Sequence, residues 1–187
     1  ALIVGDVEGH NVPAAAAMGQ LRSAIRAFVA AGHRPSDVAA GTNRLHMDLD
    51  PVLLASCCYA QFHPRSGIVR IIRAGHLPPL LRLPDGRTEI LDVPGGPLLG
   101  IDATARFPES ELRLAPGSVL ALYTDGLVER RDSDIGSDIE RLRGALARLG
   151  GGGLDELADG LLRDVCRASP DRADDIALLL TEYAPPR

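Results

Sequence analysis

The sequence has no lysine and no tryptophan, and aromatic side chains of any kind make up only 3% of its 187 residues. The usual platforms on which unpaired nucleic-acid bases stack are therefore scarce. The net charge is -5, with 25 acidic and 20 basic side chains. An acidic chain offers no basic face to replace the counterions of a phosphate backbone. Nucleic acid is therefore not an expected partner.

Cysteines and long apolar runs are also few. The count of 3 cysteines is odd, and Cys57 and Cys58 are adjacent. Neighbouring cysteines bridge only with severe strain, and no CxxC or Cys/His spacing typical of zinc sites occurs. We expect small buried thiols that stay reduced in the cytoplasm. No apolar run approaches the ~20 residues that span a bilayer, so no membrane segment is expected.

The remaining composition is that of an ordinary folded domain. With 45% hydrophobic and 24% charged residues, the chain is not expected to be disordered. Its length suits one domain, which we place at residues 1–187. The chain opens at Ala1 inside an apolar run, without an initiator methionine. We therefore expect a domain that is truncated at its N-terminus and lacks its N-terminal edge.

The spacing of apolar residues changes along the chain. Helical spacing predicts two pairs of helices, at residues 14–31 and 35–50 and at 137–149 and 154–168. Apolar runs with turn signals predict strands at residues 2–4, 53–62, 68–73, 78–83, 88–91, 111–114, 119–123 and 176–181. Strands grouped between helical pairs predict an α+β fold with mainly antiparallel sheets.

Three acidic positions share one arrangement, because each lies next to an expected strand. Asp6 and Asp125 follow apolar runs, and Asp174 and Asp175 precede another. Carboxylates at strand ends can converge at the rim of a sheet, and sites built only from oxygen suit Mg²⁺ or Mn²⁺. A pair of such ions about 3.5–4 Å apart can hold a phosphoryl group. Each position alone is equally consistent with a turn or a helix cap.

Five short motifs contain these acidic residues. They are Gly5-Asp6-Val7-Glu8-Gly9-His10 with Ala14 to Met18, Ala74-Gly75-His76-Leu77-Pro78-Pro79, Pro97-Leu98-Leu99-Gly100, Tyr123-Thr124-Asp125-Gly126-Leu127-Val128-Glu129, and Asp174-Asp175-Ile176. In this order they resemble the signatures of the SpoIIE/RsbU-like branch of the metal-dependent, type 2C-like (PPM) serine/threonine protein phosphatases. The set spans nearly the whole chain, so it is far more specific than any single motif.

This resemblance implies a β-sandwich flanked by helical pairs, with two Mn²⁺ or Mg²⁺ ions at one rim. By the resemblance, Asp6 matches the carboxylate that bridges both ions, and Val7 supplies a backbone carbonyl. Asp125 and Asp174 match the remaining carboxylates, and Asp175 stays open as the alternative to Asp174. The resemblance further implies direct attack by a metal-bridging water, without a covalent nucleophile.

The resemblance also implies a substrate. Members of the family act on phosphoserine or phosphothreonine, usually on small anti-anti-sigma (STAS) proteins, in partner-switching control of transcription. We therefore expect a cytoplasmic phosphatase with an upstream sensor domain. Homodimerisation, a non-catalytic docking or dimerisation module of the same fold, and a small-molecule phosphoesterase stay open. The family's upstream acidic strand is not in this sequence, so we expect weak metal binding and weak or no activity from the chain as given.

Residues beside the acidic motifs also have expected roles. Asn11 stands where the family signature has glycine, and we expect it to keep a left-handed turn, which asparagine tolerates. His10 is interpreted as a residue that orders its loop through hydrogen bonds, with proton donation as the less favoured alternative. His76, between Gly75 and a pair of prolines, is interpreted as a structural residue. The other basic residues that could reach a site are expected on the surface or at helix ends: Arg73, Arg130, His33, His46 and His63.

The helical pair at residues 13–50 directly follows the turn that contains Asp6. Movement of this pair would displace the Asp6 carboxylate and the Val7 carbonyl. We therefore expect an upstream sensor to act on the metal site through this pair of helices.

Overall fold

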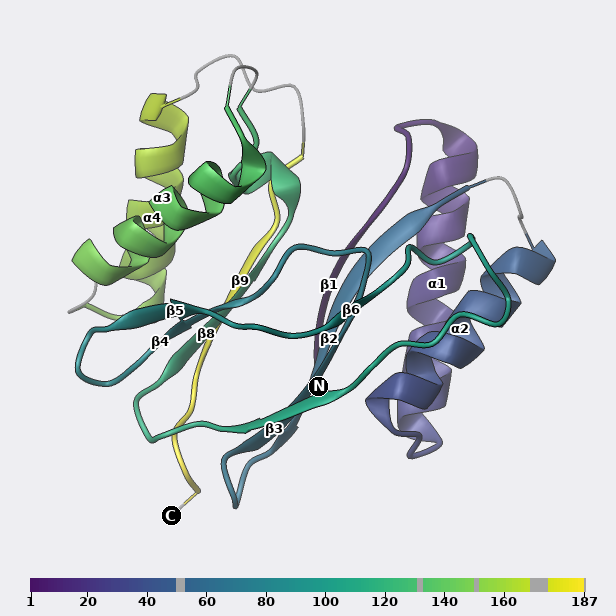
Figure 1. Cartoon of the computed structure of the whole chain (residues 1–187), viewed down its shortest axis with the longest axis horizontal. Helices are drawn as coiled ribbons and strands as arrows, with labels where there is room; N and C mark the ends of the chain where they lie inside the picture. The colour runs from purple at the N-terminus through teal and green to yellow at the C-terminus, as the bar shows by residue number, and fades with distance from the viewer. Residues whose placement is uncertain (50–52, 131–132, 150–151, 169–174, 187) are drawn as a thin grey trace. The chain divides into compact units, whose positions relative to one another are not determined.

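The computed structural model describes residues 1–49, 53–130, 133–149, 152–168 and 175–186. Figure 1 follows the chain from purple at the N-terminus to yellow at the C-terminus. The chain divides into two compact units, each built around its own sheet and its own pair of helices. Unit 1 comprises Ala1–Phe62, Val69–His76 and Val93–Leu112, and unit 2 comprises His63–Ile68, Leu77–Asp92 and Arg113–Arg187.

The sheet of unit 1 has the strand order β1-β2-β3-β6, and β7 also pairs with β3. Its strands are β1 (Leu2–Val7), β2 (Ala55–His63), β3 (Ile68–Ala74), β6 (Gly95–Gly96) and β7 (Ser110–Arg113). β1 runs antiparallel to β2, and Asp6 lies opposite Ser56 in this pairing. The short β6 pairs in parallel with β3. The sequence predicts a loop there, because two glycines carry no alternation of apolar side chains.

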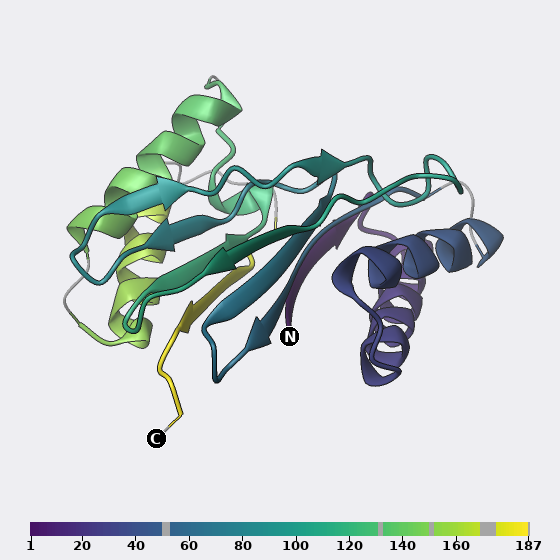
Figure 2. The same ribbon diagram turned by 60° about the horizontal axis from the view of Figure 1, so that its bottom comes forward.

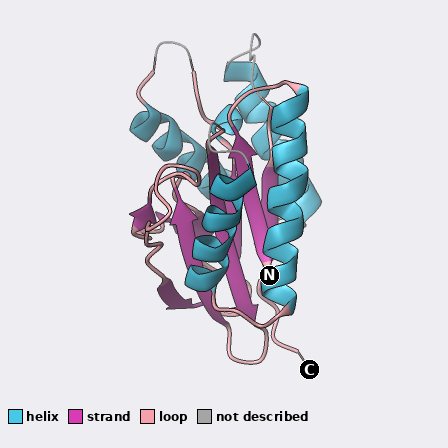
Figure 3. Ribbon diagram, turned by 90° about the vertical axis from the view of Figure 1, so that its right-hand side faces the viewer, coloured by secondary structure: helices cyan, strands magenta, loops and turns pink. Residues whose placement is uncertain are grey.

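The helical pair of unit 1 consists of α1 (Val12–Ala30) and α2 (Pro35–Leu49). Figure 3 looks onto these two helices, with strands behind them. Asn11 caps α1, since its side chain accepts a hydrogen bond from the Ala14 N–H. Apolar residues of both helices and of the strands share one core: Val7, Ala14, Ala17, Leu21, Ala39, Tyr59 and Ile72 belong to it.

The sheet of unit 2 has the order β5-β4-β8-β9, with every neighbouring pair antiparallel. Its strands are β4 (Leu80–Arg82), β5 (Thr88–Ile90), β8 (Val119–Tyr123) and β9 (Leu178–Glu182). All five residues of β8 are buried. This explains its continuous apolar sequence, because an inner strand covered on both faces has no polar face to alternate. A 3-10 turn, η1 (Asp125–Leu127), follows β8 closely.

The helical pair of unit 2 consists of α3 (Ile135–Arg148) and α4 (Leu154–Ala168), which lie beside the strands of this unit in Figure 2. The side chain of Asp134 caps α3 by accepting hydrogen bonds from the Gly136 and Ser137 N–H groups. The core joins both helices to the sheet: Leu80, Tyr123, Leu127, Leu142, Leu146, Leu157 and Leu161 belong to it.

The predicted α+β class, with mainly antiparallel sheets and two helical pairs, is confirmed. The main differences are at element ends. α3 begins at Ile135 rather than residue 137, because Asp134 serves as its cap. β1 continues through Val7, so Asp6 lies within the last residues of the strand instead of after it. No helix in the described part of the chain is long and apolar enough to cross a bilayer.

Candidate functional site

Asp6 lies near the end of β1, where the strand leaves the core. Its carboxylate is exposed, and its Oδ1 accepts a hydrogen bond of 2.9 Å from the Val7 N–H. The Val7 side chain is buried, which anchors the backbone on the other side. A Cβ at Gly5 would lie 2.6 Å from the Ser56 carbonyl oxygen, so the strands approach closely only with glycine there. Packing therefore fixes the backbone that presents Asp6.

The residues after Asp6 form a turn into α1. Gly9 supplies the left-handed backbone of this turn, with φ +98. Asn11 is extended, with φ -102, so the prediction of a left-handed Asn11 is wrong. The reason is its role as a helix cap, which requires extended backbone so that Oδ1 can reach the Ala14 N–H. His10 is exposed, and its role stays a prediction.

The Ala74-Gly75-His76 segment is held against β2. His76 is only 7% exposed, and its Nδ1 lies 2.8 Å from Ser56 Oγ. Gly75 has φ +60, and its N–H donates a hydrogen bond to the Gly96 carbonyl at 2.9 Å. The burial of His76 and its contact with Ser56 agree with the structural role that the sequence predicts.

Arg73 is the second residue that holds this segment. It donates from Nη1 to the His76 carbonyl at 2.7 Å and from Nε to the Val93 carbonyl at 2.8 Å. The expectation that Arg73 is a solvated surface residue is wrong. Its guanidinium instead satisfies two loop carbonyls, which is a task suited to its fork of N–H donors.

Helix α2 holds two further segments of unit 1. Asn43 donates to the Asp102 carbonyl at 2.7 Å and accepts from the Gly100 N–H at 2.9 Å. His46 is only 2% exposed, and its Nε2 lies 2.7 Å from the Leu53 carbonyl oxygen. His46 lies in the last turn of α2, which agrees with the helix-end position expected as one alternative. The ring is buried rather than on the surface, because this polar contact satisfies it.

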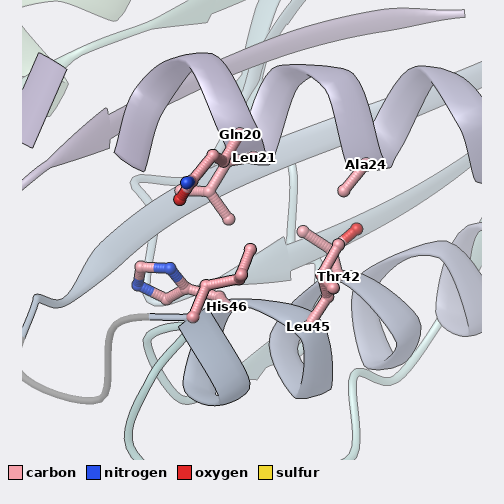
Figure 4. Close-up of a pocket in the computed structure, with 7 residues that line it drawn as sticks. Gln20, Leu21, Ala24, Thr42, Leu45 and His46 are labelled. Carbon is pink, nitrogen blue, oxygen red and sulfur yellow. The ribbon is translucent and has the colours of Figure 1, made fainter. Parts of the chain in front are cut away.

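The Leu53 and Gly100 segments, which α2 holds, connect to the end of β1 beside Asp6. Leu99 and Ala55 exchange two backbone hydrogen bonds, of 2.8 and 3.1 Å, and Ala55 pairs with Val7 in the sheet. Figure 4 shows Thr42, Leu45 and His46 of α2 facing Gln20, Leu21 and Ala24 of α1. The gap that these side chains line leaves about 0 Å³ for water. The helices and the end of β1 therefore form one connected, close-packed assembly.

Unit 2 contains the second acidic position. Asp125 opens η1, is half-buried, and accepts a hydrogen bond of 2.9 Å at Oδ1 from the Gly126 N–H. The preceding Thr124 donates from Oγ1 to the Asp175 carbonyl at 3.2 Å and accepts at Oγ1 from the Ala177 N–H at 2.9 Å. These bonds bring the Asp125 turn and the segment after the third acidic motif together. Asp174 lies outside the described residues.

A pocket of about 280 Å³ opens beside Asp125, with Leu77, Glu129, Ser133, Ile135 and Asp138 as its other lining residues. Arg130 donates from Nε to Asp138 Oδ1 at 2.6 Å and from Nη2 to Ser133 Oγ at 2.9 Å. The side chain of Asp138 is 1% exposed. Arg130 is therefore only partly solvated, unlike the surface residue that the sequence predicts, because its guanidinium pairs with a buried carboxylate.

The sequence gives little sign of Asp138. An aspartate in the first turn of a helix is usually explained by the helix dipole alone. Its partner Arg130 lies in the segment between η1 and α3, so no helical or strand spacing links the two residues. The only available signal is the charge pair itself, with opposite charges eight residues apart.

The oxygen donors at both positions fit a divalent ion. Asp6 and the Val7 carbonyl in unit 1, and Asp125 with Asp175 in unit 2, offer only oxygen, which Mg²⁺ and Mn²⁺ prefer. In Asp6 and Asp125, a backbone N–H of the next residue orients the carboxylate. Within the described residues, no three His, Cys, Asp or Glu side chains meet as a metal-binding group. The ligand roles therefore stay predictions.

The two adjacent cysteines lie in β2 and take no part in this chemistry. Cys57 and Cys58 are free and buried, as the sequence predicts. Burial raises the pKa of each thiol from 9.0 to about 12. Both therefore stay protonated near neutral pH and act as small apolar side chains.

Comparison with known proteins gives consistent results. A family model described as Stage II sporulation protein E (SpoIIE) matches residues 1–184. Phosphoserine phosphatase RsbU of Bacillus subtilis (strain 168) is 25% identical over 131 residues, which are 70% of this chain and 39% of that protein. The solved RsbU and RsbW domains of Rv1364c from Mycobacterium tuberculosis are 31% identical, with a TM-score of 0.89, over 99% of this chain and 52% of that chain.

A more distant structure shares the fold alone. The catalytic domain of the serine threonine protein phosphatase PstP, solved in complex with 2 manganese ions, is 13% identical with a TM-score of 0.70. The match covers 97% of this chain and 86% of that one. By contrast, this chain spans only 39% and 52% of the lengths of RsbU and of the Mycobacterium structure.

Proposed function

Because the chain belongs to the SpoIIE family, we propose that it is a metal-dependent phosphatase that hydrolyses phosphoserine or phosphothreonine in proteins. The fixed geometry of the acidic positions carries the proposal. Asp6 lies in the last residues of β1 and Asp125 in the turn after β8, and a backbone N–H holds each carboxylate. Thr124 ties the Asp125 turn to the segment after the third acidic motif. The similarity to a phosphoserine phosphatase supports the same reaction.

The proposed cofactor is a pair of Mn²⁺ or Mg²⁺ ions. Asp6, the Val7 carbonyl, Asp125 and Asp174 would hold them, with Asp175 as the alternative to Asp174. The presence of 2 manganese ions in a structure of the same fold supports this proposal. When bound, such ions supply Lewis acidity at the phosphoryl group. The N–H groups of Val7 and Gly126 hold the Asp6 and Asp125 carboxylates in place, which lowers the cost of ordering them.

The proposed substrate is a phosphorylated anti-anti-sigma (STAS) protein, so the protein would act in partner switching in the cytoplasm, downstream of a sensor. The similarity to RsbU supports this assignment. The assignment of residues 1–187 to a single phosphatase domain belongs to the same proposal.

Phosphate release from a phosphoserine-bearing STAS protein in the presence of Mn²⁺ tests this function, with a chelator as the first control. Asp125→Asn should lower the rate at least about 100-fold, because a carboxylate is replaced by a neutral amide. Asp85→Asn removes a carboxylate from the exposed turn between β4 and β5 and should leave the rate unchanged. An unmodified protein that releases phosphate, with an equal rate for Asp125→Asn, would falsify the proposal.

Binding of the phosphorylated STAS protein without hydrolysis would instead favour the docking or dimerisation module. Hydrolysis of small aryl phosphates, with no activity on any phosphoprotein, would favour the small-molecule phosphoesterase. The three outcomes are distinct, so one substrate panel separates the candidates.

We further propose that α1 and α2 regulate the site. α2 holds the Leu53 and Gly100 segments through His46 and Asn43, and these segments continue to the strands beside Asp6. A sensor that shifts α2 would therefore move the backbone that presents Asp6 and the Val7 carbonyl.

A further inference from the structure

We propose that Ser56 and His76 form a positioning pair for Asp6, which holds the strand beside this carboxylate in the geometry that binds metal. The inference rests on the metal site proposed above. It assigns a role to His76 and to Ser56 that goes beyond ordering a loop, and all three residues belong to unit 1.

The register of the sheet places Ser56 beside Asp6. Asp6 lies opposite Ser56 in the antiparallel pair of β1 and β2. Directly opposed residues of such a pair point to the same face, with Cβ atoms about 4.5–5.5 Å apart. Ser56 is therefore the cross-strand neighbour of the proposed metal ligand.

Among the described residues, β1 is an edge strand of its sheet. β1 lies at one end of the order β1-β2-β3-β6, so β2 is its one neighbouring strand among the described residues. The position of Asp6 therefore depends on the position of β2. Any group that fixes β2 at Ser56 also fixes Asp6.

His76, the partner of Ser56, is held in a rigid segment. Ser56 Oγ lies 2.8 Å from Nδ1 of the buried His76 ring. The His76 carbonyl is held by Arg73 Nη1 at 2.7 Å. Gly75 has a left-handed backbone, and a Cβ there would overlap Leu98. The ring is thus carried by a segment with little freedom to move, and its contact with Ser56 transmits that rigidity to β2.

Ser56 and His76 act on the proposed metal site indirectly. Ser56 Oγ is in contact with His76 Nδ1 at 2.8 Å, and neither residue is a ligand in the proposed metal site. Ser56 and His76 therefore act on the metal only through Asp6, as positioning residues.

The test measures Mn²⁺ dissociation constants from the electron paramagnetic resonance signal of free Mn²⁺, which also detects weak binding. Ser56→Ala should weaken binding about tenfold, whereas Ser56→Thr, which keeps the hydroxyl, should restore most of the affinity. His76→Asn places a side-chain nitrogen near the position of Nδ1 and should bind more tightly than His76→Gln. Ser66→Ala, in the turn between β2 and β3, should bind Mn²⁺ like the unmodified protein.

Two further measurements separate positioning from simple stability. The Tm of the metal-free Ser56→Ala variant should fall by no more than about 4 °C. The Ser56→Ala/His76→Ala double variant should bind no more weakly than His76→Ala alone, because the two residues act as one unit.

Unchanged Mn²⁺ affinity in Ser56→Ala would overturn the positioning role and leave the proposed phosphatase intact. Additive losses in the double variant would also overturn it. A failure of the unmodified chain to bind Mn²⁺ at all would instead contradict the proposed metal site on which the inference rests.

Discussion

Thr124 and Ala177 are joined by two hydrogen bonds: the Thr124 N–H donates to the Ala177 carbonyl at 3.0 Å, and the Ala177 N–H donates to Thr124 Oγ1 at 2.9 Å. The same hydroxyl donates to the Asp175 carbonyl. Thr124 precedes Asp125, and Ala177 closely follows the acidic pair of the third motif. One side chain therefore joins two acidic motifs that are about fifty residues apart in the sequence.

Thr124→Val tests this connection, because valine keeps the shape of threonine and removes the hydroxyl. The Ala177 N–H then loses its acceptor, so the free energy of unfolding should fall by about 1–3 kcal/mol. Under the proposed metal site, Mn²⁺ affinity should fall as well. Denaturant unfolding and an Mn²⁺ titration measure the two effects.

Thr124→Ser is the matched control for this prediction. Serine keeps the hydroxyl and should retain both properties within about 0.5–1 kcal/mol. Wild-type stability in Thr124→Val would show that the hydroxyl contributes nothing to holding the two segments together.

Gly41 of α2 lies against the Phe28 ring of α1, and its replacement tests the proposed regulation by these helices. A Cβ at Gly41 would lie 2.8 Å from Cζ of Phe28. Gly41→Ala should therefore displace the Phe28 ring, disturb the packing between the two helices, and lower the free energy of unfolding by about 1–3 kcal/mol. If movement of the helices reaches Asp6, Mn²⁺ affinity should fall in the same variant.

Two variants control for the helical effect of alanine. A Cβ at Gly19 of α1 meets nothing within 4 Å, so Gly19→Ala should stabilise the helix by about 0.5–1 kcal/mol. Adding Phe28→Leu to Gly41→Ala should restore part of the stability by making room. A stabilising Gly41→Ala would contradict the close packing, and an unchanged Mn²⁺ affinity would contradict the regulation.

The buried ion pair of Arg130 and Asp138 gives a prediction about the pocket beside Asp125. Asp138→Ala leaves Arg130, which is one third exposed, without its carboxylate partner. Because water can partly solvate this guanidinium, the loss of unfolding free energy should be about 2–4 kcal/mol, below that of a fully buried pair. Thermal unfolding measures it.

An apolar replacement of both partners separates the charge from the packing. Arg130→Met with Asp138→Leu removes both charges and should be more stable than Asp138→Ala alone. A double variant that is less stable than Asp138→Ala would contradict this expectation. It would show that the ion pair stabilises the protein beyond the cost of an unpaired charge.

The sequence predicts the elements well because their apolar residues repeat at regular spacing. It also places Asp6 and Asp125 at strand ends, since a carboxylate directly beside an apolar run is visible in the sequence itself. The short β6 escapes prediction because Gly95 and Gly96 have no side chains to alternate.

The supporting contacts of the candidate site could not be predicted. Ser56 and His76 are 20 residues apart, and Asn43 and Gly100 are 57 apart. Each of these residues is unexceptional in its own segment, and only the folded chain brings the partners together. Arg73 shows the same limit, because a charged residue in a strand is usually solvated, whereas here two loop carbonyls accept its hydrogen bonds.

Cys57 and Cys58 should be unreactive in the folded protein. Their pKa of about 12, against an ordinary 9.0, lowers the thiolate fraction about a thousandfold at pH 8, and only the thiolate attacks alkylating reagents. In a Cys166→Ser background, iodoacetamide should label neither residue under native conditions and both after unfolding, as mass spectrometry would show. Because Cys57 forms a β-bridge with Gly75, loosening the Ala74-Gly75-His76 segment with His76→Ala should speed labelling of Cys57. Rapid labelling of the unmodified strand at pH 8 would mean that β2 opens readily, and a β2 that opens readily could not hold Asp6 in place.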